Sequence, residues 1–199
     1  MITPSHIIYS WAMARSLDTK LGLDKTRVLG AILGGLLPDM PAYVFFFYNT
    51  VILGVSQQQL WDVLYFDSAW TPYVTLSHSF ILWPALLLLG HVVGKKLLFW
   101  IAAGGILHSF MDFTVHVDDA YRHLWPLTDW KFESPLSYWD PNHYGNIVGS
   151  LDTIAVLLLL VFIMKRTESI RMQKTIIGIS VIYITMTIVP YIVFNLYYA

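Results

Sequence analysis

Three ionisable residues recur at intervals of four in the sequence, namely His108, Asp112 and His116. If this segment is an α-helix, the three side chains lie within an arc of about 80° on one face. Imidazole and carboxylate groups at this spacing can bind one divalent cation together. Asp119 and His123 return to the same arc, but on a continuous helix His123 would lie about 22 Å from His108. The pattern therefore predicts a metal site at the first residues of the series.

Ionisable residues also lie within or beside three other apolar segments. They are His6 near the start of the chain, Asp39 in the sequence GGLLPDMP, and His78 in TLSHSF. An ionisable group in hydrocarbon is costly and needs a partner, so we expect these side chains to meet those of the first series. The predicted metal ligands are therefore His6, Asp39, His78, His108, Asp112 and His116.

Each of these residues also has a simpler interpretation. Asp39 is flanked by prolines, which interrupt helical hydrogen bonding, and it could cap the second half of a broken helix. His78 could hydrogen-bond to a neighbouring helix, and His108 with Asp112 could lock two helices together. Histidines on facing helices could also bind haem, although the adjacent carboxylate favours a harder cation. The residue types alone leave these alternatives open.

The composition is that of an integral membrane protein. Of the 199 residues, 56% are hydrophobic, 16% are aromatic and 13% are charged, whereas soluble domains average about 25% charged residues. The chain contains no cysteine, so a transition metal must be bound by nitrogen and oxygen ligands. We expect a divalent metal, zinc first, with manganese or iron as alternatives. A net charge of −1 argues against nucleic acid as a partner.

Five apolar segments are long enough, or nearly so, to cross about 30 Å of hydrocarbon as helices. They are residues 28–48, 73–93, 97–113, 147–164 and 175–197. Residues 2–17 are less apolar and could form a sixth span or an interfacial helix. We predict one all-α membrane-embedded domain, residues 1–199, built as a helical bundle of five or six spans. Extramembrane loops are expected at about residues 56–70 and 114–146.

The distribution of charge predicts an orientation for this bundle. Ten of the twelve lysine and arginine residues precede the first strong span or fall in alternate connections, which places those connections in the cytoplasm. The other connections are mainly acidic, and the candidate ligands lie near them. The site is therefore expected to face outward.

The predicted loop 114–146 is rich in aromatic residues and proline. Such a loop can form an aromatic belt at the level of the lipid headgroups. It could also cover the site, because it carries three further titratable residues: His123, Asp140 and His143. We predict these three as catalytic residues, with either histidine protonating a leaving group.

The order of the motifs resembles a known family. The segment PSHIIYSWA is followed by a glycine-rich LLPD, the triplet SHS and an HxxxD pair. This order resembles the DUF457-type membrane-bound metal-dependent hydrolases, which include LexA-regulated inner-membrane proteins and are distantly similar to zinc-dependent phospholipase C. Over about residues 2–146, the resemblance implies a bacterial inner-membrane protein whose metal ligands are His6, Asp39, His78, His108 and Asp112.

Two positions depart from the family pattern. Pro41 stands where the family usually has a second carboxylate, and Tyr73 stands where it usually has a first histidine. These departures leave open whether one or two metals bind and whether catalysis is retained.

The leading hypothesis is a metal-dependent hydrolase that acts on a phosphoester or lipid-linked substrate at the outer face of the membrane. A metal-bound water would attack, and Asp39 or Asp112 would orient it or accept its proton. The alternative is a non-enzymatic membrane protein in which the same residues form a structural clamp or a proton or metal-ion site. The lipid bilayer is the expected partner in both cases.

Overall fold

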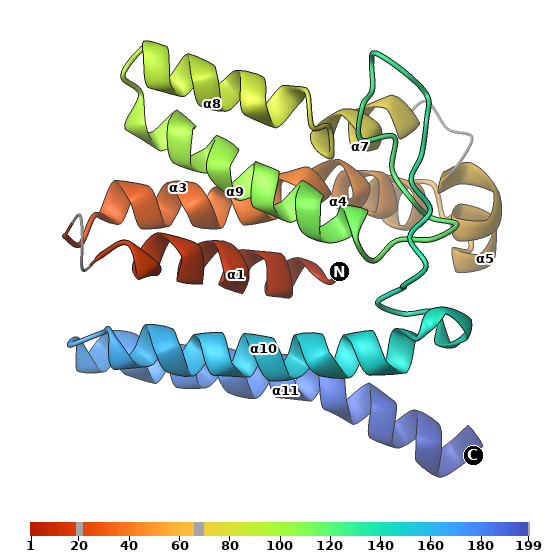
Figure 1. Cartoon of the computed structure of the whole chain (residues 1–199). Helices are drawn as coiled ribbons and strands as arrows, with labels where there is room; N and C mark the ends of the chain where they lie inside the picture. Colours follow the sequence, from red (N-terminus) through yellow and green to blue (C-terminus); the bar gives the residue numbers. More distant parts are fainter. Residues whose placement is uncertain (19–21, 66–69, 199) are drawn as a thin grey trace.

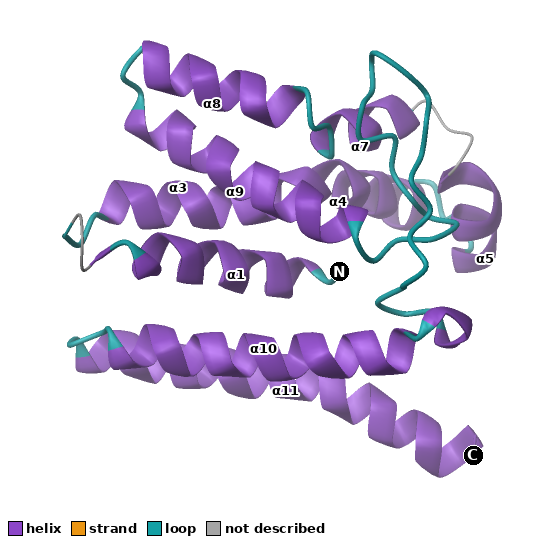
Figure 2. Ribbon diagram, viewed as in Figure 1, coloured by secondary structure: helices purple, strands orange, loops and turns teal. Residues whose placement is uncertain are grey.

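The chain is described by a computed structural model that covers residues 1–18, 22–65 and 70–198. It is 72% helical, and the described residues form no strand. The predicted all-α class is therefore confirmed. The long helices lie side by side, and most of the irregular backbone gathers at one end of the molecule (Figures 1 and 2).

Among the described residues, three helical segments are long and apolar enough to cross a membrane, namely Lys25–Ile52, Gly145–Lys165 and Ile170–Val189. The bent pair α7 (Thr71–Ser77) and α8 (Leu82–Val92) would be a fourth if it forms one span. Two further helices, α1 (Thr3–Ser16) and α9 (Lys96–Phe113), run beside them (Figure 1). The fold is thus compatible with a membrane protein, and the total of five or six spans stays a prediction.

The helices α1, α3 (Lys25–Leu36) and α9 are held together by close approach of their backbones. A Cβ atom on Gly34 of α3 would overlap the carbonyl of Ile101 and would lie 2.8 Å from the Cα atom of Gly104 on α9. On the other side of α3, a Cβ atom on Gly35 would lie 2.7 Å from the carbonyl oxygen of His6. Glycine allows membrane helices to pack this closely. The ligands on α1 and α9 are therefore brought to the same part of α3.

The first apolar span is interrupted at Asp39. After α3, a short 3-10 turn, η1 (Leu37–Asp39), is followed by α4 (Met40–Phe47) and the π-helical turn η2 (Tyr48–Ile52). Pro38 and Pro41 lack the backbone N–H that a continuous helix requires. The carbonyl of Pro38 accepts a hydrogen bond from Ser77 Oγ at 2.6 Å, which connects this interruption to α7. This break turns the side chain of Asp39 towards α7 and α9.

The segment 73–93, predicted as one helix, is broken between α7 and α8, which meet at 52°. The hydroxyl of Ser79 accepts hydrogen bonds from the backbone N–H groups of Ile81 and Leu82, and such side-chain bonding competes with helix continuation. The indole of Trp83 donates to the carbonyl of Ser77 at 2.7 Å. The bend places His78 at the end of α7, inside the molecule.

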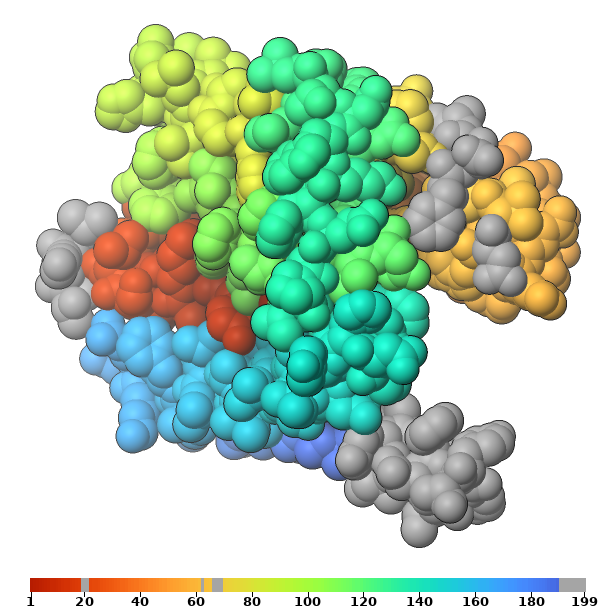
Figure 3. Space-filling view, turned by 45° about the vertical axis from the view of Figure 1, so that its right-hand side comes forward, coloured from red at the N-terminus to blue at the C-terminus, as the bar shows by residue number. Residues whose placement is uncertain are grey.

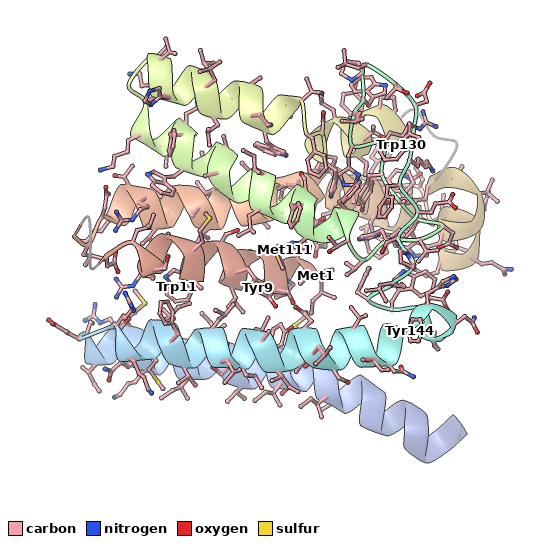
Figure 4. The ribbon with its side chains drawn as sticks, in the orientation of Figure 1. Met1, Tyr9, Trp11, Met111, Trp130 and Tyr144 are labelled. Atoms are coloured by element: carbon pink, nitrogen blue, oxygen red, sulfur yellow. The ribbon has the colours of Figure 1, made fainter. Side chains whose placement is uncertain are left out.

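The helices α10 (Gly145–Lys165) and α11 (Ile170–Tyr198) pack on the side of α1 that faces away from α3. Tyr9 and Trp11 extend from α1 towards α10 (Figure 4), and Trp11 belongs to an apolar cluster with residues of α10 and α11. Asp152 of α10 accepts hydrogen bonds from Ser5 of α1 at 2.6 Å and from Tyr183 of α11 at 3.2 Å. This buried polar contact connects the three helices.

The two predicted extramembrane loops differ in structure. The segment 56–70 contains α5 (Gln57–Gln59) and the π-helical turn η3 (Leu60–Leu64) within its described part. The segment 114–144 is irregular except for the 3-10 turn η4 (Pro141–His143). Trp130 lies in a part of this segment far from α10, whereas Tyr144 adjoins the first turn of α10 (Figure 4). The segment covers one end of the helices (Figure 3).

The prediction that His116, Asp119 and His123 continue the helical face of α9 is wrong. The helix ends at Phe113, and the chain turns back. Asp119 stabilises this turn, because its Oδ1 accepts a hydrogen bond from the N–H of Val117 at 3.2 Å. Ser134 adds a second connection, donating from its hydroxyl to the carbonyl of Thr114. The loop therefore returns His116 to the end of α9.

Candidate metal centre

Four ionisable side chains from separate parts of the chain meet at the break in the first span. They are Asp39 at the end of η1, His78 at the end of α7, and His108 and Asp112 on α9. One ligand atom from each lies within 4.8 Å of those of the other three. His78, His108 and Asp112 are buried, and Asp39 is partly exposed. The centre thus lies inside the helical bundle with access from the Asp39 side.

The distances between the ligand atoms fit a small cation. Asp112 Oδ2 lies 3.1 Å from His108 Nε2 and 3.4 Å from His78 Nε2. Asp39 Oδ1 lies 3.4 Å from His108 Nε2 and 3.6 Å from His78 Nε2. In a tetrahedral zinc site with bonds of about 2.0–2.1 Å, neighbouring ligand atoms are about 3.3 Å apart. The four distances between carboxylate oxygens and imidazole nitrogens are close to this value, so the four residues are near enough to share one divalent cation.

The two imidazoles are oriented for metal binding by backbone carbonyls. His108 Nδ1 lies 2.9 Å from the carbonyl oxygen of Gly35, and His78 Nδ1 lies 2.8 Å from that of Val74. A carbonyl can only accept, so each Nδ1 donates, and each Nε2 faces the carboxylates. Within the described part of the chain, the Nε2 atoms lie 3.1–3.6 Å from carboxylate oxygens but make no hydrogen bond of good geometry. A cation between these nitrogens and the carboxylates satisfies both groups.

The second oxygen of Asp112 faces a different set of groups. Its Oδ1 lies 2.9 Å from His6 Nε2 and 3.2 Å from His116 Nε2. The amino nitrogen of Met1 lies 2.6 Å from the same oxygen. The ring of His6 is stacked on that of His108 with 3.7 Å between centroids. The predicted ligands His6 and His116 are thus near the centre, but on the opposite side of the Asp112 carboxylate from His78.

Several neighbours of the centre carry no signal in the sequence that would have identified them. Thr3 donates a hydrogen bond to Asp39 Oδ2 and lies 2.8 Å, oxygen to oxygen, from Tyr43. The ring of Tyr121 is stacked on that of His78, with centroids 3.8 Å apart. These residues support the ligands through contacts between segments that are distant in the chain, and no spacing rule relates them.

A cavity of about 820 Å³ opens beside the centre. Asp39, Asp112 and His116 lie on its wall, and much of the remaining surface is aromatic or aliphatic, including Phe46 of α4 and Met186 of α11. The cavity lining that the structure describes contains no lysine or arginine. An apolar group can therefore reach the ligands from the side of α4 and α11.

The three predicted catalytic residues lie in the covering segment. His123 is buried between the rings of Phe80 and Phe113, with centroid distances of 4.8 and 5.3 Å. Burial lowers the pKa of His123 to about 4, so its ring is neutral at pH 7. His143 lies 2.6 Å from Asp140, and its hydrogen bond holds the pKa of that carboxyl below its usual value. None of the three belongs to the four-residue centre, and their catalytic roles stay predictions.

Comparisons with known proteins give no guide to function. No family model matches the chain, and searches of the curated proteins and of the solved structures find no significant match. The function must therefore be argued from the site itself.

Proposed function

We propose that this protein is a membrane-embedded metal-dependent hydrolase whose cation is held by Asp39, His78, His108 and Asp112. The observation that carries the proposal is the convergence of two buried imidazole Nε2 atoms and two carboxylates, with one ligand atom from each residue within 4.8 Å of the others. This donor set of nitrogen and oxygen suits zinc, and also manganese or iron. The resemblance of the motifs to DUF457-type hydrolases agrees with this reading.

In the proposed topology the chain crosses the membrane six times. The segment from α3 to η2, the bent pair α7 and α8, and the helices α9, α10 and α11 form five spans, and α1 enters from the outer side as the sixth. The position of basic residues supports this arrangement, because Arg15 donates to the carbonyl of Arg166 and Lys96 pairs with Asp24 at the end remote from the site. The positive-inside rule then assigns that end to the cytoplasm of a bacterial inner membrane and the centre to the outer side.

A bound divalent cation supplies Lewis acidity and a hydroxide ion near neutral pH. The residues of the chain would hold and orient the cation. His78 and His108 would bind it through Nε2, and the carbonyls of Val74 and Gly35 fix their rings. Asp39 is the ligand that combines partial exposure with a place on the cavity wall. It is therefore placed to accept the proton that a nucleophilic water loses.

The proposed substrate is a lipid with a phosphoester or another lipid-linked bond. Its chain would occupy the apolar part of the cavity, between Phe46 and Met186, and the bond to be cleaved would lie near Asp39. Large cavities with an apolar wall and a few convergent polar groups are typical of small-molecule sites. The acidic wall, which offers no lysine or arginine among its described residues, makes phosphate binding depend on the metal charge.

The second candidate function is a non-enzymatic clamp or a proton or metal-ion site. It is favoured by the stacking of His6 on His108, which ties α1 to α9. A clamp would use the contacts of His6 Nε2 and His108 Nε2 with the Asp112 carboxylate, at 2.9 and 3.1 Å. The metal-dependent reading is preferred because four ligand atoms from separate segments converge within 4.8 Å of one another.

The test compares the full chain in detergent, without a histidine tag, with the double variant His108→Ala/Asp112→Ala. Bound zinc, manganese and iron are measured by plasma mass spectrometry, and hydrolysis is assayed on phospholipids and polyprenyl phosphates. We expect the double variant to lose bound metal and hydrolysis together. His91→Ala is the matched control, because His91 is exposed on α8 away from the centre. Absence of hydrolysis in metal-loaded protein, or its survival in the double variant, would refute the proposal.

A further inference from the structure

We infer that Asp112 bridges two cations, and that His6 Nε2, His116 Nε2 and Asp112 Oδ1 form a second metal subsite. The inference rests on the proposed function only in sharing Asp112 with the first centre. One carboxylate oxygen, Oδ2, faces His78 and His108, whereas Oδ1 faces His6 and His116. Each oxygen of the carboxylate thus has its own pair of imidazole nitrogens.

The geometry of His6 points to a ligand. Its side chain is completely buried, and neither ring nitrogen has a hydrogen-bond partner among the residues that the structure describes. Nε2 nevertheless lies 2.9 Å from Asp112 Oδ1. A buried imidazole with two unsatisfied nitrogens is costly. A cation between His6 and Asp112 satisfies the nitrogen that faces the carboxylate.

The geometry of His116 is that of a metal-ligating histidine with an outer carboxylate. Its Nδ1 lies 2.8 Å from Asp119 Oδ2, and its Nε2 lies 3.2 Å from Asp112 Oδ1. Asp119 is itself held by the indole N–H of Trp139 at 3.2 Å and by the N–H of Val117. The Asp119 carboxylate thus holds the Nδ1 side of the His116 ring, and Nε2 is directed at Asp112 Oδ1.

The charge around the cavity also calls for a second cation. Four carboxylates, those of Asp39, Asp112, Asp118 and Asp119, lie on a wall that has no lysine or arginine among its described residues. Even with the Met1 amino group counted, one divalent cation would leave this wall with a formal charge of −1, so it favours further positive charge. The place accommodates a positive charge, because the amino nitrogen of Met1 lies 2.6 Å from Asp112 Oδ1 and 3.2 Å from His116 Nε2. Two cations on one bridging carboxylate are suited to a phosphoester substrate.

The test counts cations in the full-length, untagged protein. Purified protein freed of metal is titrated with Mn²⁺, and stoichiometry is measured by plasma mass spectrometry after removal of free metal. We expect two equivalents in the parent protein and in the control His91→Ala, and one in His6→Ala and in His116→Ala. Asp112→Ala should bind neither equivalent tightly. Electron paramagnetic resonance should show an exchange-coupled manganese pair in the parent protein and an isolated ion in His116→Ala.

A second variant distinguishes weakened metal binding from loss of folding. Asp119→Asn keeps the size of the side chain and is a positioning change, so we expect about 10- to 100-fold weaker binding of the second equivalent only. A single equivalent in the parent protein, with no coupled signal, would overturn the inference. This failure is separate from that of the proposed function. One cation with intact hydrolysis refutes only the second subsite, and two cations without hydrolysis refute only the enzyme.

Discussion

Replacement of Gly34 by alanine should damage the metal centre, although Gly34 is not one of its four residues. The added Cβ atom would lie 2.1 Å from the carbonyl oxygen of Ile101 on α9, whereas ordinary contact begins at 3.4 Å. The helices α3 and α9 must therefore separate by about 1.3 Å. The bond between His108 Nδ1 and the carbonyl of the adjacent Gly35 is 2.9 Å long. A shift of this size lengthens it to about 4.2 Å, too long for a hydrogen bond.

Two measurable effects should follow from this shift. Loss of an orienting contact on a metal-bound histidine weakens metal affinity by about 10- to 100-fold, and overpacking of the helix contact lowers stability by about 1–3 kcal/mol. Metal titration and thermal unfolding of Gly34→Ala in detergent measure the two effects. Gly178→Ala on α11 is the matched control, because a Cβ atom there meets nothing within 4 Å. If Gly34→Ala binds metal as tightly as the parent protein, the link between helix packing and the orientation of His108 is refuted.

Three further outcomes test other parts of the structure. Asp152→Ala should lower the stability in detergent by about 1–2 kcal/mol and leave the metal content unchanged, because Asp152 connects α10 with α1 and α11 away from the centre; a loss of metal would contradict this. Removal of metal with a chelator should lower the unfolding temperature of the parent protein but not that of His108→Ala/Asp112→Ala, and equal shifts would argue against metal binding at these residues. Because burial lowers the pKa of His123 from 6.5 to about 4, the unfolded chain binds a proton at this site before the folded chain does. The parent protein should therefore lose stability relative to His123→Phe as the pH falls from 6.5 towards 4, and parallel pH profiles would contradict the assignment.

The sequence predicts the parts of the site that depend on local patterns. The spacing of His108 and Asp112 places both on one face of α9, and the prolines around Asp39 predict a broken helix there. Hydropathy finds the long apolar helices. These features follow from rules that relate residues a few positions apart.

The remaining features depend on contacts between distant segments. The end of α9 at Phe113 and the return of His116 to Asp112 are fixed by bonds of the covering segment, which a helical repeat cannot predict. The break after α7 is likewise set by the hydroxyl of Ser79. The stacking of Tyr121 on His78 joins residues that no spacing relates. Periodicity describes one helix at a time, so it cannot position such groups.

The order of the ligands along the chain has a consequence for biogenesis. The four residues of the first centre begin at Asp39 and end at Asp112, and none lies on α10 or α11. During synthesis, all four ligand residues are therefore made before the last two helices. The ligands can meet before α10 and α11 pack against α1, so the final helix pair adds a wall of the cavity, through Met186, and no ligand.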